Sequence, residues 1–392
     1  MSVLGLLAST VVHASGQGVQ SLWDSALGKH TGLRPNNLDW CDLPCWVGAV
    51  PGVDDVRLPA SLQSWDSRNH RLAWLALQDV SFRNAVAAAI SRHGAHRVGL
   101  VLGTSTSGAR QTEVAYKKRH ESGEWPADFN YRRTHATDAL CRFTAEVLQL
   151  QGPMAAVSTA CSSSAKVFLT AQRWMDAGLI DAAIVGGADS LCLSTLHGFF
   201  SLQLLSENIC RPFDAARNGL SIGEAAGFVL LQREPASVYF AGGGESGDAW
   251  HMSTPHPEGR GARDAIYAAL AAARIGPEDI GYVNAHGTAT PANDRSEAAA
   301  LVEVFGAHGV PVSSTKGITG HTLGAAGIVE AIVTAQALER QILPATTGLA
   351  VPDPLLAVDL VTEARPAVFQ YAMSNNFGFG GSNCTLIFGK TE

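Results

Sequence analysis

Cys161 is the first residue whose type and position could support chemistry. It lies in STACSSSAK, directly after an apolar segment and at the start of an alanine-rich run typical of a helix. A thiol at a helix N-terminus meets unpaired N–H groups and the positive end of the helix dipole, and both favour the thiolate. The position predicts a nucleophile with a lowered pKa. A buried cysteine capped by the following serines is the alternative interpretation.

Two histidines and a lysine occur in small-residue segments further along the chain. His286 lies in VNAHGTATP, where a short apolar run ends, and STKGITGHTLGAAG contains both Lys316 and His321. A side chain at the C-terminal end of a strand in an open α/β sheet points into a crevice. An imidazole can donate an N–H bond near neutral pH without carrying a permanent charge. Either histidine alone could be structural, but together they complement a thiol nucleophile.

A glycine-rich loop, NNFGFGGSN, precedes the last apolar run of the chain. Gly378, Gly380 and Gly381 permit positive φ and close backbone approach. Phe377 and Phe379 supply apolar walls. Such a loop can present a backbone N–H to an oxyanion, and a tight hairpin with core phenylalanines is the other interpretation.

Short β-branched runs alternate with alanine-rich runs, which is the pattern of an α/β protein. We expect strands at 99–103, 154–159, 181–187, 282–285 and 383–389. Because these runs are apolar throughout, helices should cover both faces of the sheets. The segments 155–175 and 311–338 each read as strand, loop and helix, and each contains Thr-Ala-Gln. This similarity predicts an internal duplication with a seam near residue 235.

Composition restricts the function classes. The chain has 392 residues, of which 46% are hydrophobic and 16% are charged, as expected for a large enzyme with a thick interior. A net charge of -7 argues against general nucleic-acid binding. No apolar stretch approaches the roughly 20 residues that span a bilayer. The seven cysteines lack paired CxxC spacing, so we expect neither a zinc site nor a disulfide framework, and we expect a reducing cytoplasm.

The segments around Cys161, around His286, from Lys316 to His321 and in the glycine-rich loop together resemble the β-ketoacyl-ACP synthases. The resemblance is in particular to the elongating Cys-His-His type. The nucleophile motif, His-Gly-Thr-x-Thr-Pro, Lys-x-x-x-x-Gly-His-x-x-Gly-Ala-Ala-Gly and Gly-Phe-Gly-Gly occur in the family's order. The resemblance implies a thiolase-like α/β fold whose duplicated halves form a five-layered α-β-α-β-α sandwich. We expect an N-terminal half at residues 1–235 that carries Cys161, and a C-terminal half at residues 236–392 that carries His286 and His321.

The resemblance also implies a decarboxylative Claisen condensation. Cys161 would hold an acyl group, and His286 and His321 would stabilise the enolate formed from a malonyl thioester. The backbone N–H groups of Cys161 and Phe379 would form the oxyanion hole, and Lys316 would pair with Glu297. The residues expected to bind substrate are Thr288, Thr290, Phe377, Gly378 and Phe379.

The expected partners are an acyl carrier protein and a second ketosynthase-like subunit, in a homodimer or a heterodimer. Arg68 and Arg71 are the predicted docking residues for the carrier. We expect no cofactor of the chain's own, because the phosphopantetheine group arrives on the carrier, and we expect no metal.

Related classes provide the alternatives. Thiolases and initiating ketosynthases use Cys-His-Cys or Cys-His-Asn sets, and His321 argues against both. Chain-length-factor subunits lack the cysteine, so Cys161 argues against a non-enzymatic subunit, although a catalytic subunit could work only with such a partner. Fatty acid, polyketide and aryl polyene synthesis stay open as pathways.

Overall fold

The N-terminal half of the computed structural model, which describes residues 3–391, is built on a mixed sheet. Its strands follow the order β6-β5-β7-β9-β1. β5 is parallel to β6 and β7, whereas β9 is antiparallel to both β7 and β1. Their bounds are β1 (Leu4–His13), β5 (Val98–Gly103), β6 (Met154–Val157), β7 (Ala182–Asp189) and β9 (Ala225–Gln232).

The C-terminal half repeats this topology. Its strands follow the order β12-β11-β16-β17-β10, with the same sequence of parallel and antiparallel neighbours. The bounds are β10 (Val238–Gly247), β11 (Ile280–Asn284), β12 (Pro311–Ser313), β16 (Tyr371–Gly378) and β17 (Ser382–Lys390). β1 and β10 pair where the halves meet. The predicted boundary at residue 235 lies between β9 and β10.

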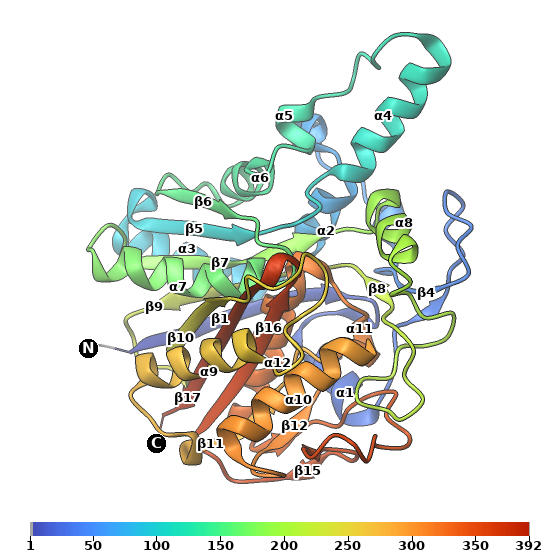
Figure 1. Cartoon of the computed structure of the whole chain (residues 1–392). Helices are drawn as coiled ribbons and strands as arrows, with labels where there is room; N and C mark the ends of the chain where they lie inside the picture. Colours follow the sequence, from blue (N-terminus) through green and yellow to red (C-terminus); the bar gives the residue numbers. More distant parts are fainter. Residues whose placement is uncertain (1–2, 392) are drawn as a thin grey trace.

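Helices form the other three layers (Figure 1). α7 (Ser163–Asp176) and α12 (Ala326–Arg340) pack together between the two halves of the sheet, in one apolar core. α2 (Arg68–Ala76), α3 (Val80–His93) and α6 (Ala139–Leu148) cover the outer face of the N-terminal half. α9 (Arg260–Ala273) and α10 (Pro291–Phe305) cover the outer face of the C-terminal half. The predicted five-layered sandwich is confirmed.

The sequence of β5 shows why both faces are covered. Val101 belongs to the inner core, whereas Leu100 and Leu102 belong to the outer one. Alternate side chains of a strand point to opposite faces, so a run without polar residues needs apolar cover on both sides. No helix among residues 3–391 combines the length and apolar character that crossing a membrane requires.

Some helices do not belong to these layers. α4 (Ala109–Ser122) and α5 (Tyr131–Thr134) project from the N-terminal half (Figure 1).

The first turns of α7 and α12 approach so closely that only glycine fits at position 327, and the end of β5 lies so close to α7 that only glycine fits at position 103. A Cβ at Gly327 would lie 2.4 Å from the Ala165 nitrogen, and a Cβ at Gly103 would lie 2.4 Å from the Ser164 nitrogen. The Ile328 N–H donates to Ser164 Oγ across this junction at 3.0 Å. The residues that immediately precede each helix are therefore brought to the same place.

We predict that Gly327→Ala destabilises the protein by about 2 kcal/mol, because the added methyl group overpacks the junction. Gly198→Ala is the matched control: Gly198 lies inside α8 (Leu193–Ser201), where an added Cβ meets nothing within 4 Å. Its effect should be neutral or slightly stabilising. Chemical denaturation measures both variants, and equal midpoints for Gly327→Ala and wild type would contradict the close approach.

Candidate active site

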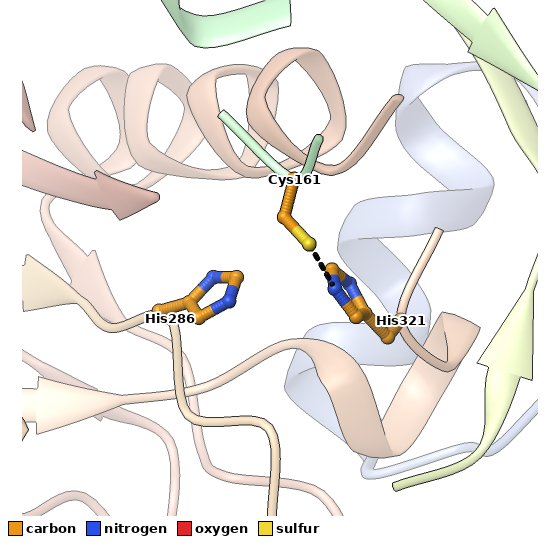
Figure 2. Close-up of side chains that lie close together, drawn as sticks. All are labelled: Cys161, His286 and His321. Atoms are coloured by element: carbon orange, nitrogen blue, oxygen red, sulfur yellow. Dashed lines mark hydrogen bonds between the residues drawn. The ribbon is translucent and has the colours of Figure 1, made fainter. Parts of the chain in front are cut away.

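Cys161 lies in the turn between β6 and α7, and its side chain is buried (Figure 2). Ala160 takes a left-handed conformation, with φ of 52°, which turns the chain sharply before the cysteine. The Thr159 N–H donates to Ser163 Oγ at 2.9 Å, and this bond closes the turn. The small residues around Cys161 therefore hold the thiol at the N-terminal end of α7.

His286 and His321 reach the same thiol from the C-terminal half (Figure 2). His321 Nε2 lies 2.9 Å from Cys161 Sγ. The two imidazole rings are 5.2 Å apart at an interplanar angle of 88°. His286 follows β11, and His321 lies between the short helix α11 (Lys316–Thr319) and α12. The three residues that the sequence singled out are thus brought together, and all are buried.

The pKa of Cys161 differs from our expectation. Burial raises it to about 11, and the Phe379 N–H and the charge of Lys316 only partly counteract this rise. The expected lowering was wrong because the helix N-terminus lies inside the protein, where desolvation of the thiolate dominates. The thiol therefore needs a neighbouring base, and His321 is within hydrogen-bonding distance.

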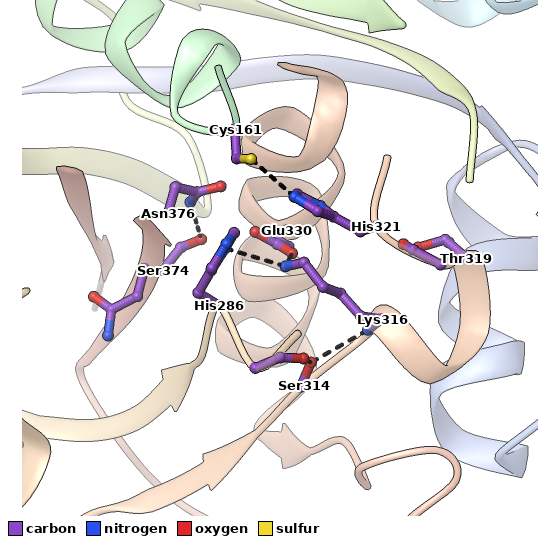
Figure 3. A network of polar contacts seen from close by, with 12 residues as sticks. Cys161, His286, Ser314, Lys316, Thr319, His321, Glu330, Ser374 and Asn376 are labelled. Atoms are coloured by element: carbon purple, nitrogen blue, oxygen red, sulfur yellow. Dashed lines mark hydrogen bonds and ion pairs between the residues drawn. The ribbon is translucent and has the colours of Figure 1, made fainter. Parts of the chain in front are cut away.

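Both histidines are neutral near pH 7. Burial lowers the pKa of His286 and of His321 well below the usual value, and the charge of Lys316 lowers both further. Lys316 Nζ lies 3.3 Å from His286 Nδ1 (Figure 3). Because an ammonium can only donate, Nδ1 must accept and Nε2 must carry the proton. His286 therefore presents an N–H donor to the pocket.

This fixed tautomer bears on metal binding. The ligand atoms of Cys161, His286 and His321 lie within 4.8 Å of one another, as in a metal site. A metal on His286 Nε2 would move the ring proton to Nδ1, opposite the Lys316 ammonium. The residues present therefore do not fit a resident metal ion while Lys316 holds His286.

The predicted Lys316–Glu297 pair is wrong. Lys316 forms its ion pair with Glu330 of α12, in the buried network of Figure 3. Glu297 instead accepts the N–H groups of His286 at 2.9 Å and Gly287 at 2.8 Å. Burial raises the pKa of each carboxyl group to about 7. Glu297 thus holds the backbone of the histidine loop, while Glu330 compensates the charge of the lysine.

The predicted substrate residues line one pocket with the three reactive side chains: Thr288, Thr290, Phe377, Gly378 and Phe379. The Phe379 N–H points to the thiol of Cys161. A Cβ at Gly378 would lie 3.3 Å from the Cys161 nitrogen, so the backbones of the two segments nearly touch. The Phe379 N–H and the backbone of Cys161 therefore lie close together at the thiol.

The predicted carrier-docking residues do not suit that role equally. Arg68 is only 4% exposed, and its guanidinium pairs with Glu224 at 2.7 Å and Asp54 at 2.6 Å. A side chain held in this way cannot meet a partner, so its assignment is corrected. Arg71 is partly exposed and pairs with Asp66 at 2.6 Å.

Several pocket residues were missed from the sequence. Phe199 of α8 stacks on Phe379, with ring centroids 5.1 Å apart. Leu204, Asp248 and Asn383 also line the pocket. Glu330 could have been found, since it is a lone acid within the apolar run GIVEAIV. The pocket residues belong to segments that only the fold brings near Cys161, and no local pattern marks them.

Comparison with known proteins agrees with this site. Residues 69–236 match the family described as Beta-ketoacyl synthase, N-terminal domain, and residues 238–350 match its C-terminal domain. 3-Oxoacyl-[acyl-carrier-protein] synthase 2 of Staphylococcus aureus (strain COL) is 35% identical over 96% of this chain and 95% of its own length.

Solved structures share the fold over the whole chain. The structure of a ketosynthase (ApeO) in complex with its chain length factor (ApeC) from Xenorhabdus doucetiae matches at a TM-score of 0.90 and 39% identity, covering 100% of this chain and 98% of that chain. A β-ketoacyl synthase from Burkholderia phymatum STM815 matches at 0.88 and 28%, covering all of both chains. The chain belongs to the β-ketoacyl synthase family of thiolase-like condensing enzymes.

Proposed function

We propose that this enzyme joins an acyl group held on Cys161 to the carbanion of a decarboxylated malonyl thioester, giving a 3-ketoacyl thioester. One observation carries the proposal: a buried thiol lies 2.9 Å from a neutral imidazole, with a second neutral imidazole beside it. The chemistry needs a nucleophile and donors for an enolate, and it needs no carboxylate.

In the first half-reaction Sγ of Cys161 attacks the carbonyl carbon of an acyl thioester. The thiol proton passes to His321 Nε2 and then to the sulfur of the leaving thiol, so the histidine ends neutral. The N–H groups of Cys161 and Phe379 stabilise the oxyanion. Each such donor is worth roughly 3 kcal/mol.

In the second half-reaction the malonyl group loses carbon dioxide, and the electron pair of the broken bond forms an enolate. His286 Nε2–H donates to the enolate oxygen, and His321 donates in the tautomer that carries its proton on Nε2, which its unpartnered Nδ1 permits. The enolate carbon attacks the acyl carbon, the Cys161 thiolate leaves, and one proton restores the thiol. Lys316 supports this step by holding His286 in the tautomer that donates.

The substrates are proposed to arrive as pantetheine thioesters on an acyl carrier protein, so the chain needs no cofactor of its own. Thr288 and Thr290 line the pocket and hydrogen-bond to each other at 2.9 Å, where their hydroxyl groups can contact the pantetheine arm. The cysteines of the chain are free thiols, which suits the cytoplasm that we propose as its location.

A second candidate is a catalytic subunit that works only with a chain-length-factor-like partner. The 39% identity to a chain of a ketosynthase–chain length factor complex, against 35% to the synthase of S. aureus, favours it and a specialised polyketide or aryl polyene product. The edge strand β6 is apolar, and Met154 is 42% exposed, so this edge is a candidate surface for a second subunit. Native mass spectrometry combined with an activity assay separates the candidates: an active homodimer rules out the obligate partner.

We predict that Cys161→Ala abolishes acylation, because no other thiol faces the pocket among the residues described. Intact-protein mass spectrometry after mixing with acyl carrier proteins measures the adduct. Cys210→Ala is the control, since Cys210 is a buried thiol that does not line the pocket. An acyl adduct that persists in Cys161→Ala would sink the assignment of the nucleophile.

We predict that His286→Ala keeps acylation of Cys161 but lowers malonyl-dependent condensation by about 100-fold or more, since it removes only an enolate donor. His321→Ala should slow both half-reactions, because His321 Nε2 lies within hydrogen-bonding distance of the thiol and is proposed to take its proton. Single-turnover acylation and condensation assays distinguish the two variants. Unchanged condensation in His286→Ala would refute its role.

We predict that Lys316→Met moves the acid limb of condensation to higher pH, by on the order of one pH unit. The charge of Lys316 lowers the pKa of both histidines. Without it they take up protons at a higher pH and lose the neutral form. The pH profile of single-turnover condensation measures the shift, and Lys166→Met, which removes a lysine that pairs with Glu245, is the control. An unmoved acid limb would show that Lys316 does not set the state of the histidines.

A further inference from the structure

His321 is held differently from His286. Lys316 fixes the ring of His286 through Nδ1 at 3.3 Å. His321 Nδ1 is buried and has no hydrogen-bond partner among residues 3–391. Apart from the thiol itself, no polar group therefore orients the imidazole of His321, and its direction must come from its backbone.

One side of that backbone is tied to the segment before β9. The His321 N–H donates to the Ser221 carbonyl at 2.7 Å, and the His321 carbonyl accepts the Gly223 N–H at 2.9 Å. The chain then enters the 3-10 turn η5 (Leu323–Ala325) before α12. A second anchor for the His321 segment lies in this turn.

Asp189 supplies that anchor. Its Oδ2 accepts the Gly324 N–H at 2.6 Å, three residues after His321. Asp189 ends β7 in the other half of the protein, and its side chain is fully buried. A Cβ at Gly324 would lie 2.7 Å from Asp189 Oδ2, so this contact closes only because residue 324 is glycine.

The carboxylate is in turn held by the loop after β5. It accepts the N–H of Ser105 at 2.8 Å and of Thr106 at 2.9 Å, the Thr104 hydroxyl at 2.6 Å, and also the Ser105 hydroxyl. No ion pair with a cationic side chain is formed by Asp189 within the described part of the chain. Hydrogen-bond donors alone compensate its burial, and they fix it in one orientation.

The negative charge of Asp189 disfavours ionisation of the Cys161 thiol. Burial is the main cause that raises the pKa of Cys161, and the negative charge of Asp189 adds to the rise. An apolar residue at position 189 would spare the thiol this effect. The contacts of Asp189 thus serve the segment that carries His321 and not the ionisation of Cys161.

We infer that Asp189 is a positioning residue that holds the His321 segment so that Nε2 stays in contact with the Cys161 thiol. This inference rests on the proposed function, in which His321 receives the thiol proton. It adds a residue that touches no substrate and acts through the backbone of Gly324.

Alkylation of Cys161 by iodoacetamide tests the inference without any substrate. A thiol with a raised pKa reacts near neutral pH only through its contact with His321, so the wild-type rate should form a plateau between about pH 6.5 and pH 9. Without that contact the rate should rise tenfold per pH unit and show no plateau. His321→Ala is the reference for complete loss.

We expect Asp189→Asn to lose the plateau and to react at least about 10-fold more slowly at pH 7, because an amide would turn its NH₂ toward an N–H donor. Ser105→Ala is the milder variant, since it removes one hydroxyl from Asp189 together with the longer contact, 3.3 Å, that this hydroxyl accepts from the Gly324 N–H, and it should react about threefold more slowly. If Asp189→Asn does not fold, the alkylation rate of Ser105→Ala tests the inference in its place. Circular dichroism reports folding for each variant.

Asp214→Asn is the matched control. Asp214 is equally buried and accepts the N–H groups of Ala216, Ala350 and Val351, each at 2.8 Å, but it contacts neither reactive segment. It should lose stability and keep the plateau. If the plateau is kept in both Asp189→Asn and Ser105→Ala but is lost in His321→Ala, the inference about Asp189 is wrong. The proposed proton transfer to His321 would then still stand. Retention in His321→Ala would overturn the proposed proton transfer and the inference together.

Discussion

The contact between the Cys161 thiol and His321 Nε2 is the interaction on which the rest of the site depends. It joins the two halves of a duplicated fold, so neither half can form it alone. The contact exists because α7 and α12 pack with their first turns against each other, and Gly327 permits this approach, while Gly103 lets β5 pack closely on α7. Close packing at the centre of the molecule thus fixes a distance at the active site.

Burial determines the electrostatics of the site. It raises the pKa of the thiol and lowers the pKa of both imidazoles, so the uncharged forms prevail at neutral pH. One ammonium group, Lys316, is compensated by Glu330 and by the acceptor on His286. Among the residues described, N–H donors face the reactive centre and no carboxylate hydrogen-bonds to the thiol or to either imidazole ring, which suits a reaction that develops negative charge on substrate oxygens.

The two histidines obtain their positions by different means. A side-chain contact fixes the ring of His286, whereas the main chain on either side fixes His321. A ring with a free Nδ1 can exchange the proton on Nε2 without breaking another hydrogen bond. That difference matches the proposed roles, in which His286 only donates and His321 also receives a proton.

The sequence by itself determined the layered α/β fold, its duplication and the three reactive side chains, because these depend on local signals. Apolar runs and small-residue motifs around Cys161, His286 and His321 specify strands, turns and helix starts wherever they occur. The sequence did not determine the partners of buried charges. Lys316 forms its ion pair with Glu330 and not with Glu297, and Arg68 forms one with Glu224. These carboxylates come near their partners only after the helices and strands have packed. Tertiary structure also decided the pKa of Cys161: a helix N-terminus favours a thiolate in water, but this one is buried, and desolvation outweighs the dipole.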